Sequence, residues 1–102
     1  MHFKLMIDDK EKTFSVPFVK GRIFRKALKM NRTLNQGELT EEVLNELEEF
    51  VCEVFENQFT PEQIEDGLPI DGLMATLRGV FFEVINRATS SIQGGSDTSK
   101  ND

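Results

Sequence analysis

The side chains that could do chemistry are few in this sequence, and their types exclude most catalytic and metal sites. One cysteine, Cys52, and one histidine, His2, allow neither an internal disulfide nor a zinc site built from several cysteines and histidines. Cys52 lies among Glu48, Glu49 and Glu53, whose charges raise a thiol pKa, so we predict a buried, inert thiol. Phosphate-binding glycine loops and calcium-loop motifs do not occur. We therefore expect no enzyme, no metal site and no cofactor.

Charge is strongly segregated along the chain. Residues 1–32 carry nine bases and three acids, whereas residues 33–77 carry twelve acids and no base. This pattern suits head-to-tail contact between copies, although pairing within one chain would use the same charges. The net charge is −6 and the isoelectric point is near 4.8. An acidic chain argues against nucleic acid as the main partner, because phosphate binding usually needs a basic domain.

Local patterns predict an α+β fold that is mainly α-helical. An apolar and polar alternation followed by a second β-prone run predicts a hairpin over residues 2–16, with its turn at residues 8–11. Helices are expected over 21–30, from the Thr40 cap to 57, from the Thr60 and Gln63 capping box to 67, and from 71 or 73 to 88. The polar residues 89–102 should form a disordered tail, which leaves residues 1–88 as a single domain.

The first predicted helix is amphipathic. We expect its apolar face to hold Ile23, Phe24, Ala27 and Leu28. Its opposite face is basic and consists of Arg22, Arg25, Lys26 and Lys29. The second helix pairs a buried apolar stripe with many glutamates. A basic helix and an acidic helix could therefore join neighbouring copies, or the same charges could simply be solvated.

The last predicted helix is apolar around nearly all of its circumference. Such a helix is buried on more than one side, and a chain of 102 residues has difficulty enclosing one completely. It is either the central core helix or a contact to another subunit or a client, and we favour the second interpretation. The side chains that we assign to this contact are Met74, Leu77, Phe81, Phe82 and Ile85.

Short motifs in this order resemble a known family. They are Val16-Pro17-Phe18-Val19-Lys20-Gly21-Arg22, Arg25-Lys26-Ala27, Phe50-Val51-Cys52, Val54-Phe55, Asn57-Gln58-Phe59-Thr60, Gln63 and Asp66-Gly67. Over residues 3–88 the chain resembles the tail assembly chaperones of long-tailed, siphovirus-type phages and prophages of Gram-positive bacteria. The order of hairpin, basic helix, acidic helix, short helix and hydrophobic helix strengthens the resemblance.

The resemblance implies a non-enzymatic chaperone in the cytoplasm of the bacterial host. Such proteins form rings or spirals, keep the tape measure protein soluble and bring in major tail protein subunits, and no membrane is involved. We expect copies to join through Arg22, Arg25, Lys26 and Lys29 against Glu46, Glu49 and Glu53. The alternative is a small oligomeric adaptor that binds an acidic protein or nucleic acid through the basic helix.

Overall fold

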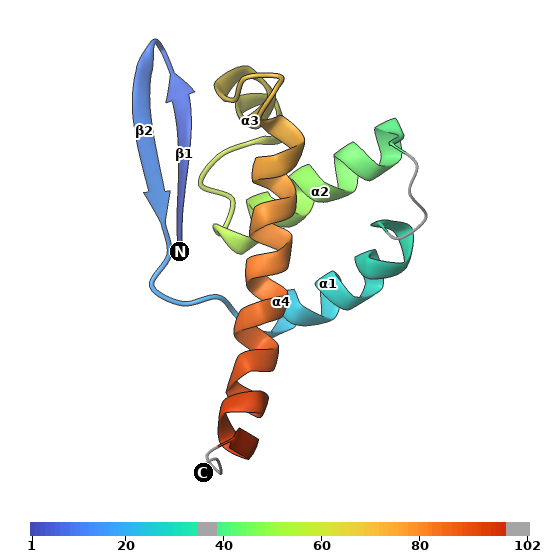
Figure 1. Cartoon of the computed structure of the whole chain (residues 1–102). Coiled ribbons are helices and arrows are strands. Elements are labelled where there is room, and N and C mark those ends of the chain that lie inside the picture. The colour runs from blue at the N-terminus through green and yellow to red at the C-terminus, as the bar shows by residue number, and fades with distance from the viewer. Residues whose placement is uncertain (35–38, 98–102) are drawn as a thin grey trace.

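The computed structural model describes the backbone of residues 1–34 and 39–97, and the side chains of these residues as far as position 90. A two-stranded hairpin stands beside the helices, and the long last helix passes in front of two others (Figure 1). The elements are β1 (His2–Ile7), β2 (Lys10–Ser15), α1 (Gly21–Leu34), α2 (Glu41–Val54), α3 (Pro61–Gly67) and α4 (Leu73–Asp97). This architecture confirms the predicted, mainly helical α+β fold.

The hairpin turns through two residues only. β1 and β2 pair antiparallel, with Ile7 opposite Lys10 and Phe3 opposite Phe14. Asp8 and Asp9 form the loop with φ angles of 53° and 64°. Positive φ at both loop residues is the signature of a type I′ turn, whose twist matches that of the strands, and aspartate tolerates this conformation better than most residues. The turn is thus shorter than the predicted span of residues 8–11.

Phenylalanines attach the hairpin to the helical part of the chain. The rings of Phe3 and Phe59 stack with their centroids 5.2 Å apart, and Phe14 meets Phe59 edge-on at 4.9 Å. Phe3 also lies 5.5 Å from the ring of Phe55, at the end of α2. All four side chains are buried. An isolated two-stranded hairpin is marginal in water, so this aromatic cluster fixes its position.

The buried face of α1 differs from the one predicted. It consists of Ile23, Ala27 and Met30, which follow helical spacing, whereas Leu28 is 55% exposed and Phe24 is half-buried. The helix also continues to Leu34 instead of ending at residue 30. The sequence has no glycine or proline from 31 to 36 to stop it. Met30, where the predicted helix ended, is buried in the core. With Ile23, Ala27 and Met30 facing the core, Leu28 faces solvent.

The helix α2 begins as predicted and ends earlier. Thr40 Oγ1 accepts a hydrogen bond of 3.1 Å from the Val43 amide, which confirms the predicted cap. The helix ends at Val54 and not at residue 57, because Glu56 and Asn57 both adopt a φ of 59°. These left-handed residues reverse the chain direction, and Phe59 then reaches the cluster under the hairpin.

The short helix α3 is fixed at both ends. The predicted capping box is present, with Thr60 N donating to Gln63 Oε1 at 2.9 Å and Gln63 N donating to Thr60 Oγ1 at 3.1 Å. At the other end, Gly67 lies directly against β1. A Cβ at this position would be 2.9 Å from the Met6 carbonyl oxygen and 3.0 Å from Leu5 Cβ. Only glycine fits so close to the strand, which ties α3 to the hairpin.

The last helix begins at Leu73, one of the two predicted starts, and runs to Asp97. It therefore continues past Ala88, where the prediction ended it. Residues 89–93 contain no glycine or proline, and the Thr89 hydroxyl donates to the Ile85 carbonyl at 2.9 Å, so that its polarity is satisfied within the helix. The remainder of the predicted disordered tail, residues 98–102, lies outside the described residues.

Candidate interaction surfaces

The basic face of α1 is partly used within the chain. Lys26 Nζ lies 2.6 Å from Glu53 Oε2 on α2, and both side chains are partly exposed. Arg22, Arg25 and Lys29 are exposed. One pair from the predicted contact between a basic and an acidic helix thus forms inside one copy, where α1 packs against α2. The three remaining bases are the part of this face that another molecule could reach.

The acidic residues predicted for the same contact occupy different environments. Glu49 is exposed on α2, and Glu53 faces Lys26. Glu46 is half-buried, and its Oε1 atom is enclosed without a hydrogen-bond partner among the described residues. Glu49 is therefore the acid of this group that is most available to another copy.

The apolar residues predicted on α4 divide between the core and the surface. Leu77 and Phe81 are 0% and 1% exposed and belong to the core, where Phe81 meets Phe50 edge-on at 5.7 Å. Enclosed side chains of this kind cannot contact another subunit without unfolding, so the structure corrects their assignment to the interface. Met74 and Ile85 are partly buried against the core, and Phe82 is 55% exposed. Phe82 is the large apolar side chain of this group that reaches the surface.

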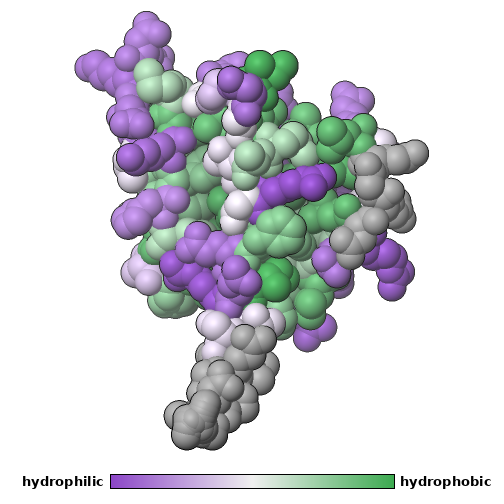
Figure 2. Space-filling model, viewed as in Figure 1, coloured by the Kyte–Doolittle hydropathy of each residue, from purple (hydrophilic) through white to green (hydrophobic). Residues whose placement is uncertain are grey.

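A second apolar area lies where the linker after the hairpin meets α4. A groove of about 420 Å³ is lined there by Pro17, Phe18 and Phe24 on one side and by Val84 and Ala88 on the other. Phe18 is 65% exposed. Figure 2 shows apolar residues interspersed with polar ones on the face that carries α4. Phe18 and Phe24 were not among the predicted contact residues. The sequence offers one signal for Phe18, because it is a large apolar residue of the motif Val16–Arg22 that lies outside any predicted helix.

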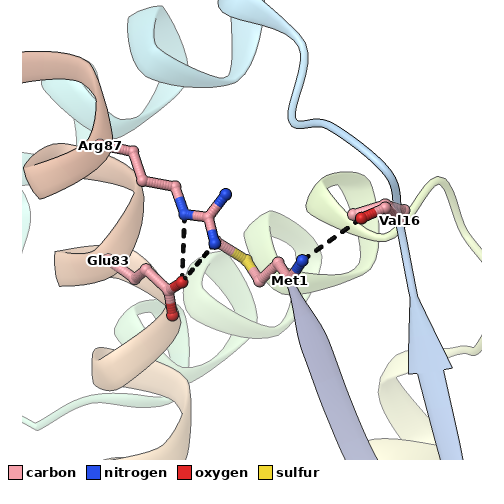
Figure 3. A network of polar contacts seen from close by, with 4 residues as sticks. All are labelled: Met1, Val16, Glu83 and Arg87. Carbon is pink, nitrogen blue, oxygen red and sulfur yellow. Dashed lines mark hydrogen bonds and ion pairs between the residues drawn. The ribbon is translucent and has the colours of Figure 1, made fainter. Parts of the chain in front are cut away.

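Ordered polar contacts flank this area. Arg87 donates from Nε and Nη2 to Glu83 Oε2 at 3.1 and 2.9 Å along one turn of α4 (Figure 3). The amino group of Met1 donates to the Val16 carbonyl at 3.3 Å, which holds the start of β1 beside the end of β2 (Figure 3). The first pair joins neighbouring turns of α4 at its surface, and the second holds together the open end of the hairpin.

A buried glutamate between α2 and α3 was missed by the sequence analysis. Glu48 is 1% exposed, and its Oε2 atom is enclosed. Burial, a side-chain hydrogen bond with Glu65 and the nearby charges of Glu65 and Glu62 raise its pKa to about 8. Its spacing in the sequence could have indicated this burial. Glu48 lies one helical turn after Leu44 and one turn before Cys52, in line with the apolar stripe of α2.

Cys52 is in the environment that the sequence predicted. It is buried, and burial together with the charges of Glu48, Glu49 and Glu53 raises the pKa of its thiol to about 11. A thiol with so high a pKa is protonated at neutral pH and is a poor nucleophile. Within the described residues, no three side chains of histidine, cysteine, aspartate or glutamate are grouped to hold a metal ion.

Across residues 1–34 and 39–97, no helix combines the length and the apolar character needed to cross a bilayer. The surfaces described above carry exposed bases on α1, exposed acids on α2 and several exposed apolar side chains.

Comparison with known proteins agrees with this description. A family model described as "Phage tail chaperone protein" matches residues 1–101. No curated protein and no solved structure matches the chain.

Proposed function

Because the chain belongs to the phage tail chaperone protein family, we propose that it keeps the tape measure protein soluble and helps recruit major tail protein subunits while a tail tube is assembled. A chaperone family points to a non-catalytic role, which agrees with the chemistry of Cys52. The match over residues 1–101 is the observation that carries the proposal. The work would take place in the cytoplasm of the bacterial host, where phage proteins are made.

Exposed apolar side chains support a role in covering a client. Phe82, Phe18 and Leu28 are each more than half exposed, although the chain has a complete core of its own. Large exposed apolar side chains near grooves are typical of protein-binding surfaces. We assign Phe82, together with the partly buried Met74 and Ile85 of the same helix, to the client or subunit contact.

Self-association is the second part of the proposal. The free bases Arg22, Arg25 and Lys29 of one copy would face acids such as Glu49 of the next, in a head-to-tail contact that builds a ring or a spiral. The pair between Lys26 and Glu53 shows that α1 and α2 have matching charges, but it is already formed within one copy. Such an array would present many Phe82 side chains along a long client.

Co-expression with the tape measure protein tests this function. We expect the unchanged chain to keep most of the tape measure protein in the soluble fraction, and Phe82→Ser to reduce that fraction several-fold because it removes exposed apolar contact area. Ile70→Ser is the matched control, since Ile70 is 93% exposed in the loop before α4. Equal solubility with and without the chain would contradict the proposed function.

A further inference from the structure

The contact between α2 and α3 contains three carboxyl groups. Glu65 and Glu62 on α3 face Glu48 on α2, and the side chains of Glu48 and Glu65 share a hydrogen bond. An ionised carboxylate has no hydrogen to donate, so two carboxyl groups can form a hydrogen bond only while one of them is protonated. The contact as it is built therefore requires a proton.

The position of Glu48 leaves little that could replace this proton. Its side chain is 1% exposed, and its Oε2 atom is enclosed without a hydrogen-bond partner among the described residues. An ionised Glu48 would therefore be a buried charge beside two acids. Burying a charge without a partner costs several kcal/mol, far more than an exposed charge does.

The other elements packed against α2 do not neutralise Glu48. The helices α1 and α4 also contact α2, but within the described residues no base forms an ion pair with Glu48. The base of α1 nearest to α2, Lys26, is engaged by Glu53. On α2 itself, Cys52 lies one turn away, and its thiol is neutral because its pKa is raised to about 11. The charges that act on Glu48 come from Glu65 and Glu62.

The helix α3 depends on its packing. It has seven residues, and an isolated helix of this length is not stable in water. Figure 1 shows α3 between the hairpin and α2. On the side of the hairpin, Gly67 lies against β1, and Ile64 is completely buried. If the contact with α2 is lost, the hairpin alone holds α3 in place.

We propose that Glu48 and Glu65 form a proton-dependent latch, and that loss of the shared proton releases α3 from α2 while the other helices stay folded. Val51 and Cys52 lie three and four residues after Glu48, on the same side of α2, and both are buried. Release of α3 would expose this side of the helix to solvent. The latch is a property of the fold and does not rest on the proposed function.

The direction of the pH effect follows from two pKa values of Glu48. In the closed form the pKa is about 8, and after release of α3 it returns toward 4.5. The open form therefore becomes more favourable relative to the closed form as pH rises from about 5 to about 8, and the balance stays constant above this range. The latch is closed in acid and loosens toward alkaline pH.

Amide hydrogen exchange of the full chain tests the latch. The reporter is the Ile64 amide, which donates to the Thr60 carbonyl at 3.1 Å. Its protection is the factor by which exchange is slower than in an unstructured peptide. We expect this protection to fall more than tenfold between about pH 6 and about pH 8. At about pH 8 it should not respond to urea below about 1 M, whereas that of the buried Ala27 in α1 should fall.

Two results of this experiment would overturn the proposal. Protection of Ile64 that stays constant between the two pH values would show that no proton holds α3 in place. A response of Ile64 to urea equal to that of Ala27 would show that α3 opens only when the whole chain unfolds.

Three variants localise the proton. Glu48→Gln keeps the shape of the side chain without a titratable group, so the protection of Ile64 should be the same at both pH values. Glu65→Gln should reduce the fall in protection several-fold, because the amide can donate to an ionised Glu48 and removes one charge. Glu49→Gln is the control, since Glu49 is exposed on α2, and should retain the full fall.

The variants also give results that would refute the latch. A full fall in Glu48→Gln would show that another group binds the proton. A full fall in Glu65→Gln would refute the pairing with α3, and this variant changes an exposed side chain, so that its folding is not at risk. All of these measurements use the free protein, so a negative result leaves the solubility test of the proposed function untouched.

Discussion

The helix α2 makes two contacts through glutamates, and they are built in opposite ways. On the side of α1, Glu53 meets Lys26 at 2.6 Å with both side chains partly in solvent. On the side of α3, Glu48 is enclosed, has no ion pair among the described residues and faces two further acids, Glu65 and Glu62. The first contact is a screened surface ion pair, worth between about 0 and 1 kcal/mol. The second depends on a proton that keeps Glu48 neutral.

The number of its charges therefore does not describe how an acidic helix behaves. Glu48 and Glu53 are alike in sequence, and each is followed by further glutamates. Their positions on the helix decide the surroundings of each carboxyl group: Glu53 meets solvent and a lysine, whereas Glu48 is enclosed between α2 and α3. The contact of α2 with α3 should therefore respond to pH, and the contact of α2 with α1 should respond to salt. Three measurements test this difference between the two contacts.

The largest effect is expected from Glu48→Gln. The pKa of Glu48 is raised from 4.5 to about 8 in the fold, so the folded chain holds a proton that the unfolded chain has lost. Stability of the unchanged protein should therefore fall as pH rises through this window and level off above it. At about pH 9, Glu48→Gln should be more stable by roughly 1 to 3 kcal/mol in urea unfolding, because it buries no charge. Below about pH 5 the two proteins should differ little.

Glu49→Gln is the control for this measurement, because Glu49 is exposed on the same helix. It should leave the dependence on pH unchanged. A stability that stays flat from pH 5 to about pH 9 in the unchanged protein would show that Glu48 is not the proton-binding group.

A smaller effect is expected from Thr60→Ala. The change removes the Oγ1 acceptor of the Gln63 amide and should lower the free energy of unfolding by about 1 kcal/mol. A looser α3 should also carry Glu65 and Glu62 away from Glu48 and lower the pKa of the latter. Thr40→Ala, at the cap of α2, should cost a similar amount of stability without changing the pH profile. Identical pH profiles for both variants would show that the position of α3 does not determine the pKa of Glu48.

The smallest effect is expected from Lys26→Met, which keeps the apolar stem and removes the ion pair. It should reduce the free energy of unfolding by less than about 1 kcal/mol, and the difference should vanish in about 1 M salt. Lys29→Met is the control, since Lys29 is exposed and forms no ion pair within the described residues. A loss that persists at high salt would show that Lys26 contributes through packing and not through charge.

Much of the fold could be predicted because local signals agreed with tertiary packing. Alternation in β1, the Thr40 cap and the capping box of Thr60 and Gln63 each fixed an element that the structure confirms. The ends of the helices were harder to predict from the sequence. Polar residues after Ala88 suggested a tail, but polarity alone does not stop a helix, and α4 continues to Asp97.

The interaction surfaces were less predictable because burial depends on which neighbours a helix finds. Leu77 and Phe81 could have served a subunit contact or the core, and only the packing of α4 against α1 and α2 decides for the core. Leu28 became exposed when the face of α1 turned toward Met30. The spacing of Glu48 places it within the apolar stripe of α2, but only the structure shows that α3, with Glu65 and Glu62, returns to cover that side of the helix.

The close approach of Gly67 to β1 also sets an order of events during synthesis. The hairpin leaves the ribosome before the residues that hold it, because Phe55, Phe59 and Gly67 come later in the chain. Phe3 and Phe14 must therefore wait, without their native neighbours, until most of the polypeptide has emerged. During translation the two phenylalanines of the hairpin therefore stay exposed to solvent until the residues that bury them in the fold have been made.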